Sequence, residues 1–313
     1  MKYTFNQNSW AWHELDQYDP AYLKKILGES PSLESWLDGM KDDISNSLRI
    51  NTSRKGEEFI WGSIVYQQDV HSESDKLLFH FYLSKDFFIT VNLDFEVLPT
   101  TDFSTLKAQM DNADNAMEGF FVLLGEILTD YLIKIDAFEE RLTDLLWNIK
   151  QHNNIDILEK IYDNRHELLI WRNLIIPIME IKIGAEEAFG NEISSKTEFR
   201  RLCKRVDRGR TLLNEYQQEI DTMINLEEVL SSHRGNEIFK TLTVITILFT
   251  PVMAWGALWG MNFEHMPELK WKYGYAAAGV LIVASTLGIY FYLKMKGWMG
   301  DILRGKKRDS FFK

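Results

Sequence analysis

Two long runs without a charged residue lie near the C-terminus of the chain. The first covers residues 241–262, about 22 positions, and the second residues 273–293, about 21, whereas a helix needs about 20 apolar residues to span a bilayer. A buried helix of a soluble protein rarely stays uncharged over such a length. The pattern therefore predicts two membrane-spanning helices that follow each other closely.

The chain before residue 105 alternates short β-rich runs with turn signals. Three runs predict strands, and two segments with short helical periodicity predict helices. The strands are expected at residues 59–66, 77–83 and 87–91, and the helices at 21–27 and 33–39. These short elements predict a small α/β domain.

From about residue 105 the apolar residues recur at helical spacing and proline is nearly absent. One helix is predicted at 116–150, and a second at 155–189, interrupted by Pro177. A third starts near Ser195 and has no clear stop before the membrane. From residue 196 to 259 it would be about 95 Å long at 1.5 Å per residue, and helices of this length usually pack along partners.

The charges that flank the two spans predict the topology. Basic residues dominate after the second span: Lys294, Lys296, Arg304, Lys306, Lys307, Arg308 and Lys313. The loop between the spans carries only two, Lys270 and Lys272, and aromatic residues cluster around it. The positive-inside rule then places the C-terminus in the cytoplasm, and two crossings place the N-terminus there too. We therefore expect a multi-pass protein of the cell membrane.

Composition and isolated residues restrict the chemistry. The formal net charge of −11 argues against nucleic acid as a partner. Cys203 is the only cysteine, so no intramolecular disulfide can form, and its basic neighbours are expected to lower its pKa. His71 and His80 are interpreted as ordinary surface or strand histidines. The sequence contains no nucleophile–base constellation and no Gly-rich phosphate loop, so we expect neither an enzyme nor an ATPase.

A polar stripe follows the first span. Two helices cannot enclose an aqueous path, so an ion-conducting protein of this type needs several copies around an axis. Steps of three and four residues place one set of residues on a single face: Asn236, Phe239, Thr243, Thr246, Thr250, Met253 and Ala257. This face is the candidate pore lining. Alternatively, the threonine hydroxyls bond back to the carbonyls of their own helix.

The end of the first span and the loop after it resemble the CorA family of magnesium transporters. The residues that carry the resemblance are 236–246 (NEIFKTLTVIT), Phe249, Pro251 and 260–269 (GMNFEHMPEL). A Gly-Met-Asn tripeptide at the outer end of the penultimate span defines that family. The remainder of the chain agrees with it in layout: an α/β domain, long helices and a basic tail.

The resemblance implies an α+β fold in a funnel-shaped homopentamer whose first membrane helices line the pore. The implied segments are a cytoplasmic α/β domain (1–105), a cytoplasmic long-helix stalk (106–238), a pore-lining span (239–262), an extracellular loop (263–272), a second span (273–293) and a basic cytoplasmic tail (294–313).

The resemblance also implies a selectivity filter. Gly260, Met261 and Asn262 would form a ring at the outer mouth, and Asn262 would hold hydrated Mg²⁺ through outer-sphere hydrogen bonds. Glu264 and Glu268 could concentrate cations there, or could simply form a solvated loop with the two lysines. The ion is the transported species, Mg²⁺ or another divalent cation such as Co²⁺ or Ni²⁺, and no cofactor is expected.

The chain departs from the family pattern in the pore and in the stalk. Met253 and Trp259 stand where threonine and tyrosine are common, and Phe239 replaces a methionine. At the stalk, many relatives carry an acidic stretch that binds intracellular Mg²⁺. Here residues 199–205 read FRRLCKR, so we expect that metal sensing is absent or has moved and that the bases pair with acids of a neighbouring subunit.

Two other functions remain open from the sequence. Some relatives with a Gly-x-Asn motif are proton-coupled zinc transporters, although Met261 favours magnesium. A non-conducting membrane metal sensor or scaffold is the third possibility, and it differs from both transporters in that Asn262 would affect no flux.

Overall fold

A computed structural model of the chain describes residues 1–28, 31–42, 45–70, 72, 75–98, 102–151, 155–261, 264 and 266–298. The chain divides into two compact units. The first comprises Met1–Ile149 with Asn153–Thr222, and the second comprises Lys150–His152 with Met223–Lys313.

A six-stranded mixed sheet is the centre of the first unit, in the order β1-β2-β6-β5-β4-β3. The strands are β1 (Lys2–Phe5), β2 (Trp10–Leu15), β3 (Ser47–Asn51), β4 (Phe59–Gln68), β5 (Lys76–Leu83) and β6 (Phe87–Val91). Neighbours are antiparallel except β2 and β6, which are parallel with Trp12 opposite Phe88. The three strands predicted from sequence are confirmed as β4, β5 and β6.

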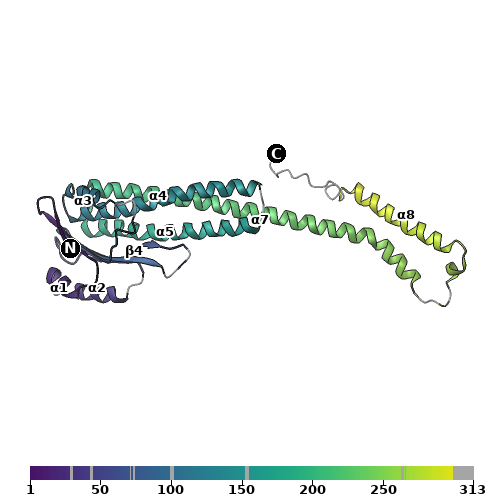
Figure 1. Cartoon of the computed structure of the whole chain (residues 1–313), viewed down its shortest axis with the longest axis horizontal. Helices are drawn as coiled ribbons and strands as arrows, with labels where there is room; N and C mark the ends of the chain where they lie inside the picture. Colours follow the sequence, from purple (N-terminus) through teal and green to yellow (C-terminus); the bar gives the residue numbers. More distant parts are fainter. Residues whose placement is uncertain are drawn as a thin grey trace. The chain divides into compact units, whose positions relative to one another are not determined.

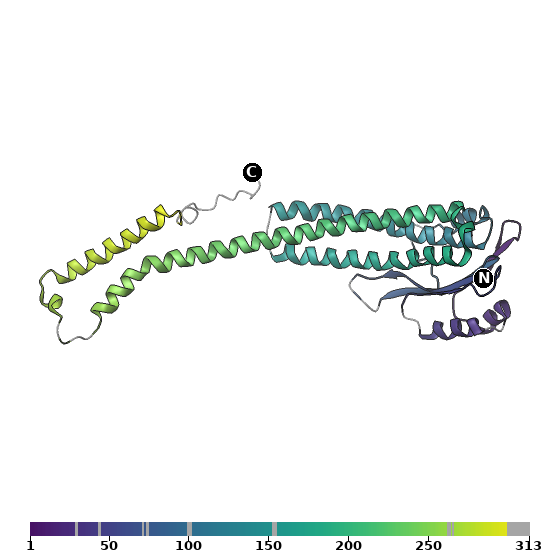
Figure 2. The ribbon, with the colours of Figure 1, turned by 180° about the vertical axis from the view of Figure 1, so that it is seen from behind.

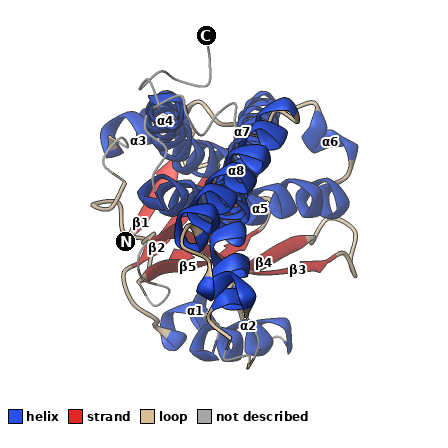
Figure 3. Cartoon of the chain, turned by 90° about the vertical axis from the view of Figure 1, so that its right-hand side faces the viewer, coloured by secondary structure: helices blue, strands red, loops and turns tan. Residues whose placement is uncertain are grey.

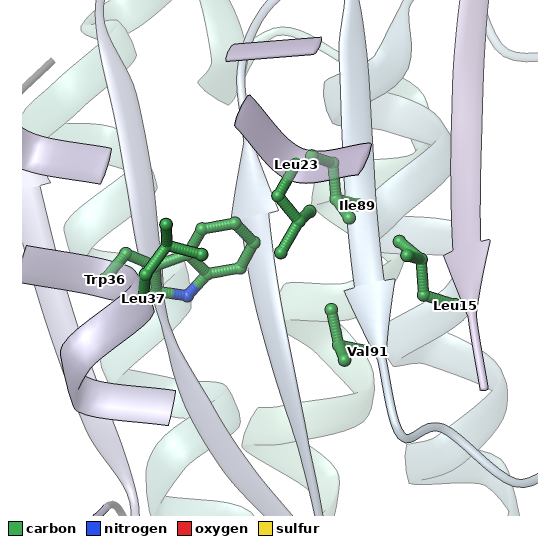
Figure 4. Close-up of a cluster of buried hydrophobic side chains, with 6 residues drawn as sticks. All are labelled: Leu15, Leu23, Trp36, Leu37, Ile89 and Val91. Carbon is green, nitrogen blue, oxygen red and sulfur yellow. The ribbon is translucent and has the colours of Figure 1, made fainter. Parts of the chain in front are cut away.

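Two short helices cover one face of this sheet. They are α1 (Pro20–Leu27) and α2 (Pro31–Asp42), close to the predicted segments. Asp19 caps α1, because its side chain accepts hydrogen bonds from the backbone N–H groups of Ala21 and Tyr22 at 3.1 Å. The layer between helices and sheet is apolar and contains Leu15, Leu23, Trp36, Leu37, Ile89 and Val91 (Figure 4).

The remaining helices of the first unit lie on the opposite side of the sheet (Figure 3). They are α3 (Phe103–Asp111), α4 (Ala116–Gln151), α5 (Ile155–Phe189), the short α6 (Asn191–Ser194) and α7 (Thr197–Trp259). Of these, α4 and α5 contact the sheet directly. In both Figure 1 and Figure 2, α4, α5 and the first part of α7 lie side by side. Phe120 of α4 joins this layer to the sheet, since its ring lies 5.2 Å from that of Phe81 and 5.5 Å from that of Phe88.

The predicted long helices are confirmed, but the predicted interruption at Pro177 is wrong. The helix α5 runs through this residue from Ile155 to Phe189. A proline inside a helix removes one backbone hydrogen bond and crowds the preceding turn. Here Pro177 is buried between the buried residues Ile175 and Ile178. The packing of the three long helices therefore outweighs the local preference.

The second unit contains the end of α7, a 3₁₀ turn η1 (Pro267–Lys270) and α8 (Gly274–Met295). Val244 and Leu293 are buried against each other, with Ile247, Leu248, Ile289 and Tyr290 packed around them. Both α7 and α8 contain an 18-residue window apolar enough to cross a membrane, and only 11% and 6% of these windows are buried within the chain. Apolar helices this exposed need a membrane or partner helices around them.

The buried His13 makes the stability of the first unit depend on pH. It is 6% exposed, and its Nδ1 lies 3.0 Å from the hydroxyl of Tyr22. Burial, together with Lys2 and the N-terminal ammonium, lowers the pKa of His13 from 6.5 to about 4. Between pH 6.5 and about 4 the unfolded chain therefore binds more protons than the folded chain. The contribution of the neutral, buried His13 to the free energy of unfolding is fully present above pH 6.5 and is lost as the pH falls towards 4.

We expect His13→Gln to reduce this acid sensitivity. The shift of the His13 pKa from 6.5 to about 4 corresponds to a loss of up to about 3 kcal/mol in the free energy of unfolding at acidic pH. Melting temperatures of the full-length protein at pH 7 and pH 4.5 give the comparison, with the exposed His166 replaced by glutamine as the control. An acid-induced loss of the same size in native protein and His13→Gln would contradict the assignment.

Candidate ion-pathway site

The candidate pore residues occupy the face of α7 that points away from α8. The opposite face is occupied by contacts with α8, through Val244 and Leu248, and by the buried Pro251. All seven candidates are exposed in the single chain: Asn236, Phe239, Thr243, Thr246, Thr250, Met253 and Ala257. This stripe is therefore part of the surface of α7 that α8 leaves uncovered, which also includes the exposed residues Leu242, Ile245 and Phe249.

The threonine hydroxyls bond back to their own helix, as the alternative from sequence predicted. Thr243 donates to the carbonyl of Phe239 at 2.7 Å. Thr246 donates to Leu242, and Thr250 to Thr246, both at 2.9 Å. A hydroxyl has one proton and two acceptor lone pairs, so this bond consumes the proton and leaves acceptor capacity on the oxygen. The three threonines therefore present a row of hydrogen-bond acceptors on the exposed stripe.

The helix α7 ends at Trp259, directly before the tripeptide. The N–H of Gly260 donates to the carbonyl of Gly256 at 2.9 Å, and a Cβ on Gly260 would lie 2.9 Å from that same oxygen. A side chain at this position would therefore force the backbone to shift. Met261 is 49% exposed.

Part of the predicted filter lies outside the described residues. This applies to Asn262, and to the side chain of Glu268, whose backbone belongs to η1. Glu264 is exposed. The assignment of Asn262 and the two glutamates to an outer mouth stays a prediction.

The basic segment of α7 has its acidic partners within the chain. Arg201 contacts Glu198 at 2.6 Å on the same helix. Arg205 lies 3.5 Å from Glu126, and Arg208 lies 3.6 Å from Asp136. Within one chain these three arginines therefore have acidic partners, from α7 itself for Arg201 and from α4 for Arg205 and Arg208. The expected pairing of the basic segment with a neighbouring subunit stays a prediction.

The expectation for Cys203 is also corrected. Burial raises the pKa of the thiol, and this outweighs the lowering by Lys182. His80 is a buried residue of β5, in agreement with its interpretation as a strand histidine, whereas His71 lies outside the described residues. Within the described part of the chain, no group of three His, Cys, Asp or Glu side chains is arranged to hold a metal ion.

Sequence reasoning missed an ion-pair cluster where α7 begins. The Lys196 ammonium lies 2.9 Å from Oδ2 of Asp114 and 3.2 Å from Oε1 of Glu118. The Glu118 side chain is 7% exposed, and burial raises its pKa despite the lysine. Asp114 precedes α4 and Glu118 lies in its first turn, so both are far from Lys196 in sequence. Only a sequence signal that α4 packs against α7 could have revealed this contact.

Fold and site define a membrane protein with a large N-terminal α/β unit and two C-terminal apolar helices, the first of which carries a polar stripe. The family model for CorA-like Mg²⁺ transporter proteins matches residues 7–295. The chain is 42% identical to the magnesium transport protein CorA of Bacillus subtilis, over 96% of this chain and 95% of that protein. The chain belongs to the CorA-like Mg²⁺ transporter family, whose members are transporters and not enzymes.

More distant similarities are found in sequence and in fold. The cobalt/magnesium transport protein CorA of Thermotoga maritima is 23% identical over 57% of this chain and 52% of that protein. The structure of the CorA magnesium transporter from Methanocaldococcus jannaschii superposes with a TM-score of 0.65 at 16% identity, covering 95% of this chain and 93% of that one. The full-length CmaX protein gives a TM-score of 0.64 at 16% identity, covering 91% and 88%. These two structural likenesses confirm the predicted α+β fold of the chain, whereas the funnel-shaped homopentamer stays a prediction.

Proposed function

We propose that this chain is one subunit of a passive Mg²⁺ channel in the cell membrane, a homopentamer in which five copies of α7 surround the pore. The stripe of exposed acceptor oxygens on α7, opposite the face that packs against α8, is the observation that carries the proposal. Five such stripes around an axis give a polar path, which one chain with two spans cannot form.

The chemistry of the stripe suits a hydrated cation. Mg²⁺ is small and gives up its water reluctantly, so it passes through a pore with its water shell. The pore wall therefore contacts the protons of these water molecules and not the ion itself. Those protons need acceptors, and the back-bonded hydroxyls of Thr243, Thr246 and Thr250 are acceptors. Uncharged oxygens attract the hydrated ion without holding it too tightly to leave.

At the outer end we propose a filter made by Gly260, Met261 and Asn262 from each subunit. Gly260 permits a tight turn directly after α7, and the Asn262 amide supplies an oxygen without a fixed charge. Glu264, exposed in the following loop, would raise the local concentration of cations.

The membrane potential would drive the ion inwards. With both termini in the cytoplasm, as the flanking lysines and arginines predict, Mg²⁺ enters down the potential. Moving two positive charges through 100 mV is favourable by about 4–5 kcal/mol. No second energy source is required.

Liposomes that contain the full-length protein and an internal Mg²⁺ dye provide the test. With an inside-negative K⁺ diffusion potential, we expect Mg²⁺ entry that depends on the potential and is unchanged by a pH gradient. Co²⁺ and Ni²⁺ entry is measured in parallel. Zn²⁺ entry that requires a proton gradient, without Mg²⁺ entry, would support a coupled zinc transporter instead, and no flux of any ion would support a sensor or scaffold.

We further expect that millimolar Mg²⁺ on the cytoplasmic side leaves the channel open. Bound Mg²⁺ needs oxygen ligands, whereas the start of α7 presents Arg201, Lys204 and Arg205. The acids close to these bases, Glu198 and Glu126, are already paired with Arg201 and Arg205. The measurement uses patches excised from proteoliposomes and perfused with 0 or ~10 mM Mg²⁺. The higher concentration is far above the dissociation constants of ordinary sensor sites for divalent ions. Closure by Mg²⁺ would show that a sensing site exists elsewhere.

A further inference from the structure

A groove lies beside the loop that joins the two apolar helices, within the second unit. It has a volume of about 530 Å³, in the size range of pockets that hold small molecules. Aromatic rings form one end, and small or aliphatic residues of α8 form the floor. The residues that line it include Trp259, Trp271, Lys272, Tyr275, Ala278 and Gly279.

The floor is an open apolar surface. A Cβ placed on Gly279 would have no atom within 4 Å, so the groove is unfilled directly above this residue. Leu281 and Ile282 continue the apolar lining along α8. A flexible hydrocarbon chain fits such a surface, because the gain comes from contact area and requires no polar partner.

The loop end of the groove is positive. Lys272 lines it, and its ammonium lies 5.9 Å from the ring centre of Tyr273. The N-terminus of the 22-residue helix α8 lies at the same end, and its N-cap residue Tyr273 makes no side-chain capping bond. A helix N-terminus carries partial positive charge, so lysine and helix together favour an anionic group at this end.

We propose that this groove binds one anionic phospholipid of the leaflet that faces the loop, with an acyl chain over Ala278 and Gly279 and the phosphate at Lys272. Along the groove, the apolar floor is followed by aromatic rings and then by the lysine. A bilayer has the same order of acyl chains, interface and headgroups. A second copy of α7 is the competing occupant. Its span carries no charged residue between Thr241 and Trp259, so the span itself offers the Lys272 ammonium no anionic partner, whereas a phosphate does.

The tryptophans of the groove allow a direct binding test that is independent of transport. The full-length protein is delipidated in detergent and titrated with phosphatidylglycerol whose acyl chains carry bromine, which quenches nearby tryptophan fluorescence. We expect saturable quenching, at least tenfold weaker for brominated phosphatidylcholine, whose headgroup has no net charge.

Two variants of α8 form a matched pair. Gly279→Leu fills the groove, whereas Gly288→Leu adds the same side chain on the same helix outside it, and a Cβ at either glycine meets open space. We expect Gly279→Leu to weaken the saturable quenching at least tenfold and Gly288→Leu to leave it unchanged. Lys272→Gln should reduce the preference for phosphatidylglycerol over phosphatidylcholine while retaining quenching by both.

Two outcomes would overturn the proposal. Quenching that is not saturable, or equal in native protein and all variants, would mean that lipids only surround the helices. The oligomer mass of Gly279→Leu is measured by light scattering. If this mass changes while the lipid affinity does not, the groove is a contact with a neighbouring subunit. Because the readout is lipid binding, a failure of the channel proposal would leave this test interpretable.

Discussion

Replacing Asn262 by alanine is expected to reduce potential-driven Mg²⁺ entry into liposomes at least tenfold. In the proposed pentamer the substitution removes five amide oxygens from the outer mouth at once. These oxygens would accept hydrogen bonds from the water molecules that surround a hydrated Mg²⁺ ion. Since about 1.4 kcal/mol corresponds to a factor of ten, the loss of little more than one net hydrogen bond is sufficient for this effect.

The matched control is Asn214→Ala, because Asn214 is an exposed asparagine on the part of α7 that belongs to the first unit. It should conduct like the native protein. Gly260→Ala is a second filter variant, in which the added Cβ lies 2.9 Å from the carbonyl oxygen of Gly256 and displaces the turn. Native rates in Asn262→Ala, with the protein correctly inserted, would remove Asn262 from the ion path.

Replacing Lys196 by methionine is expected to lower the melting temperature of the full-length protein by about 5–10 °C. The ammonium lies between Asp114 and Glu118, and the Glu118 side chain is only 7% exposed. Removing one partner of a buried pair leaves an uncompensated charge, which typically costs 3–5 kcal/mol when burial is complete. Because the Lys196 side chain is 25% exposed, we expect a smaller loss of about 2–3 kcal/mol in the free energy of unfolding. For a domain of this size, each kcal/mol lowers the melting temperature by about 2–4 °C.

Arg201→Met is the control for this experiment. Its partner Glu198 is one turn away on the same helix, and the arginine is 65% exposed, so the loss should be below about 1 kcal/mol. In the double variant Lys196→Met with Glu118→Gln, the buried charge is absent and part of the stability should return. Equal melting temperatures for Lys196→Met and Arg201→Met would show that the Lys196 cluster contributes no more than a surface pair.

The elements predicted well are those whose pattern is long and periodic. The helices α4, α5 and α7 and the two apolar runs near the C-terminus follow from helical spacing and from the absence of charge. The short elements were harder. In β2 the strand residues are almost all buried, yet His13 and Glu14 interrupt the apolar run and conceal it.

The edge strands β1 and β3 were missed for a related reason. Their residues are short runs of mixed polarity, and they become strands by pairing with β2 and β4. Register with a neighbour, and not local propensity, determines such strands. The uninterrupted course of α5 through Pro177 is another case in which packing overrides a local signal.

The sequence by itself determined the family, the two apolar spans, the long helices and the position of the candidate pore stripe on α7, because each depends on composition, spacing or a contiguous motif. Only the tertiary structure decided which face of α7 packs against α8 and which acids pair with Arg205 and Lys196. It also decided that burial raises the pKa of Cys203 although bases surround it in the chain. These features depend on segments that are distant in sequence and become neighbours only when the helices pack, so no local pattern encodes them.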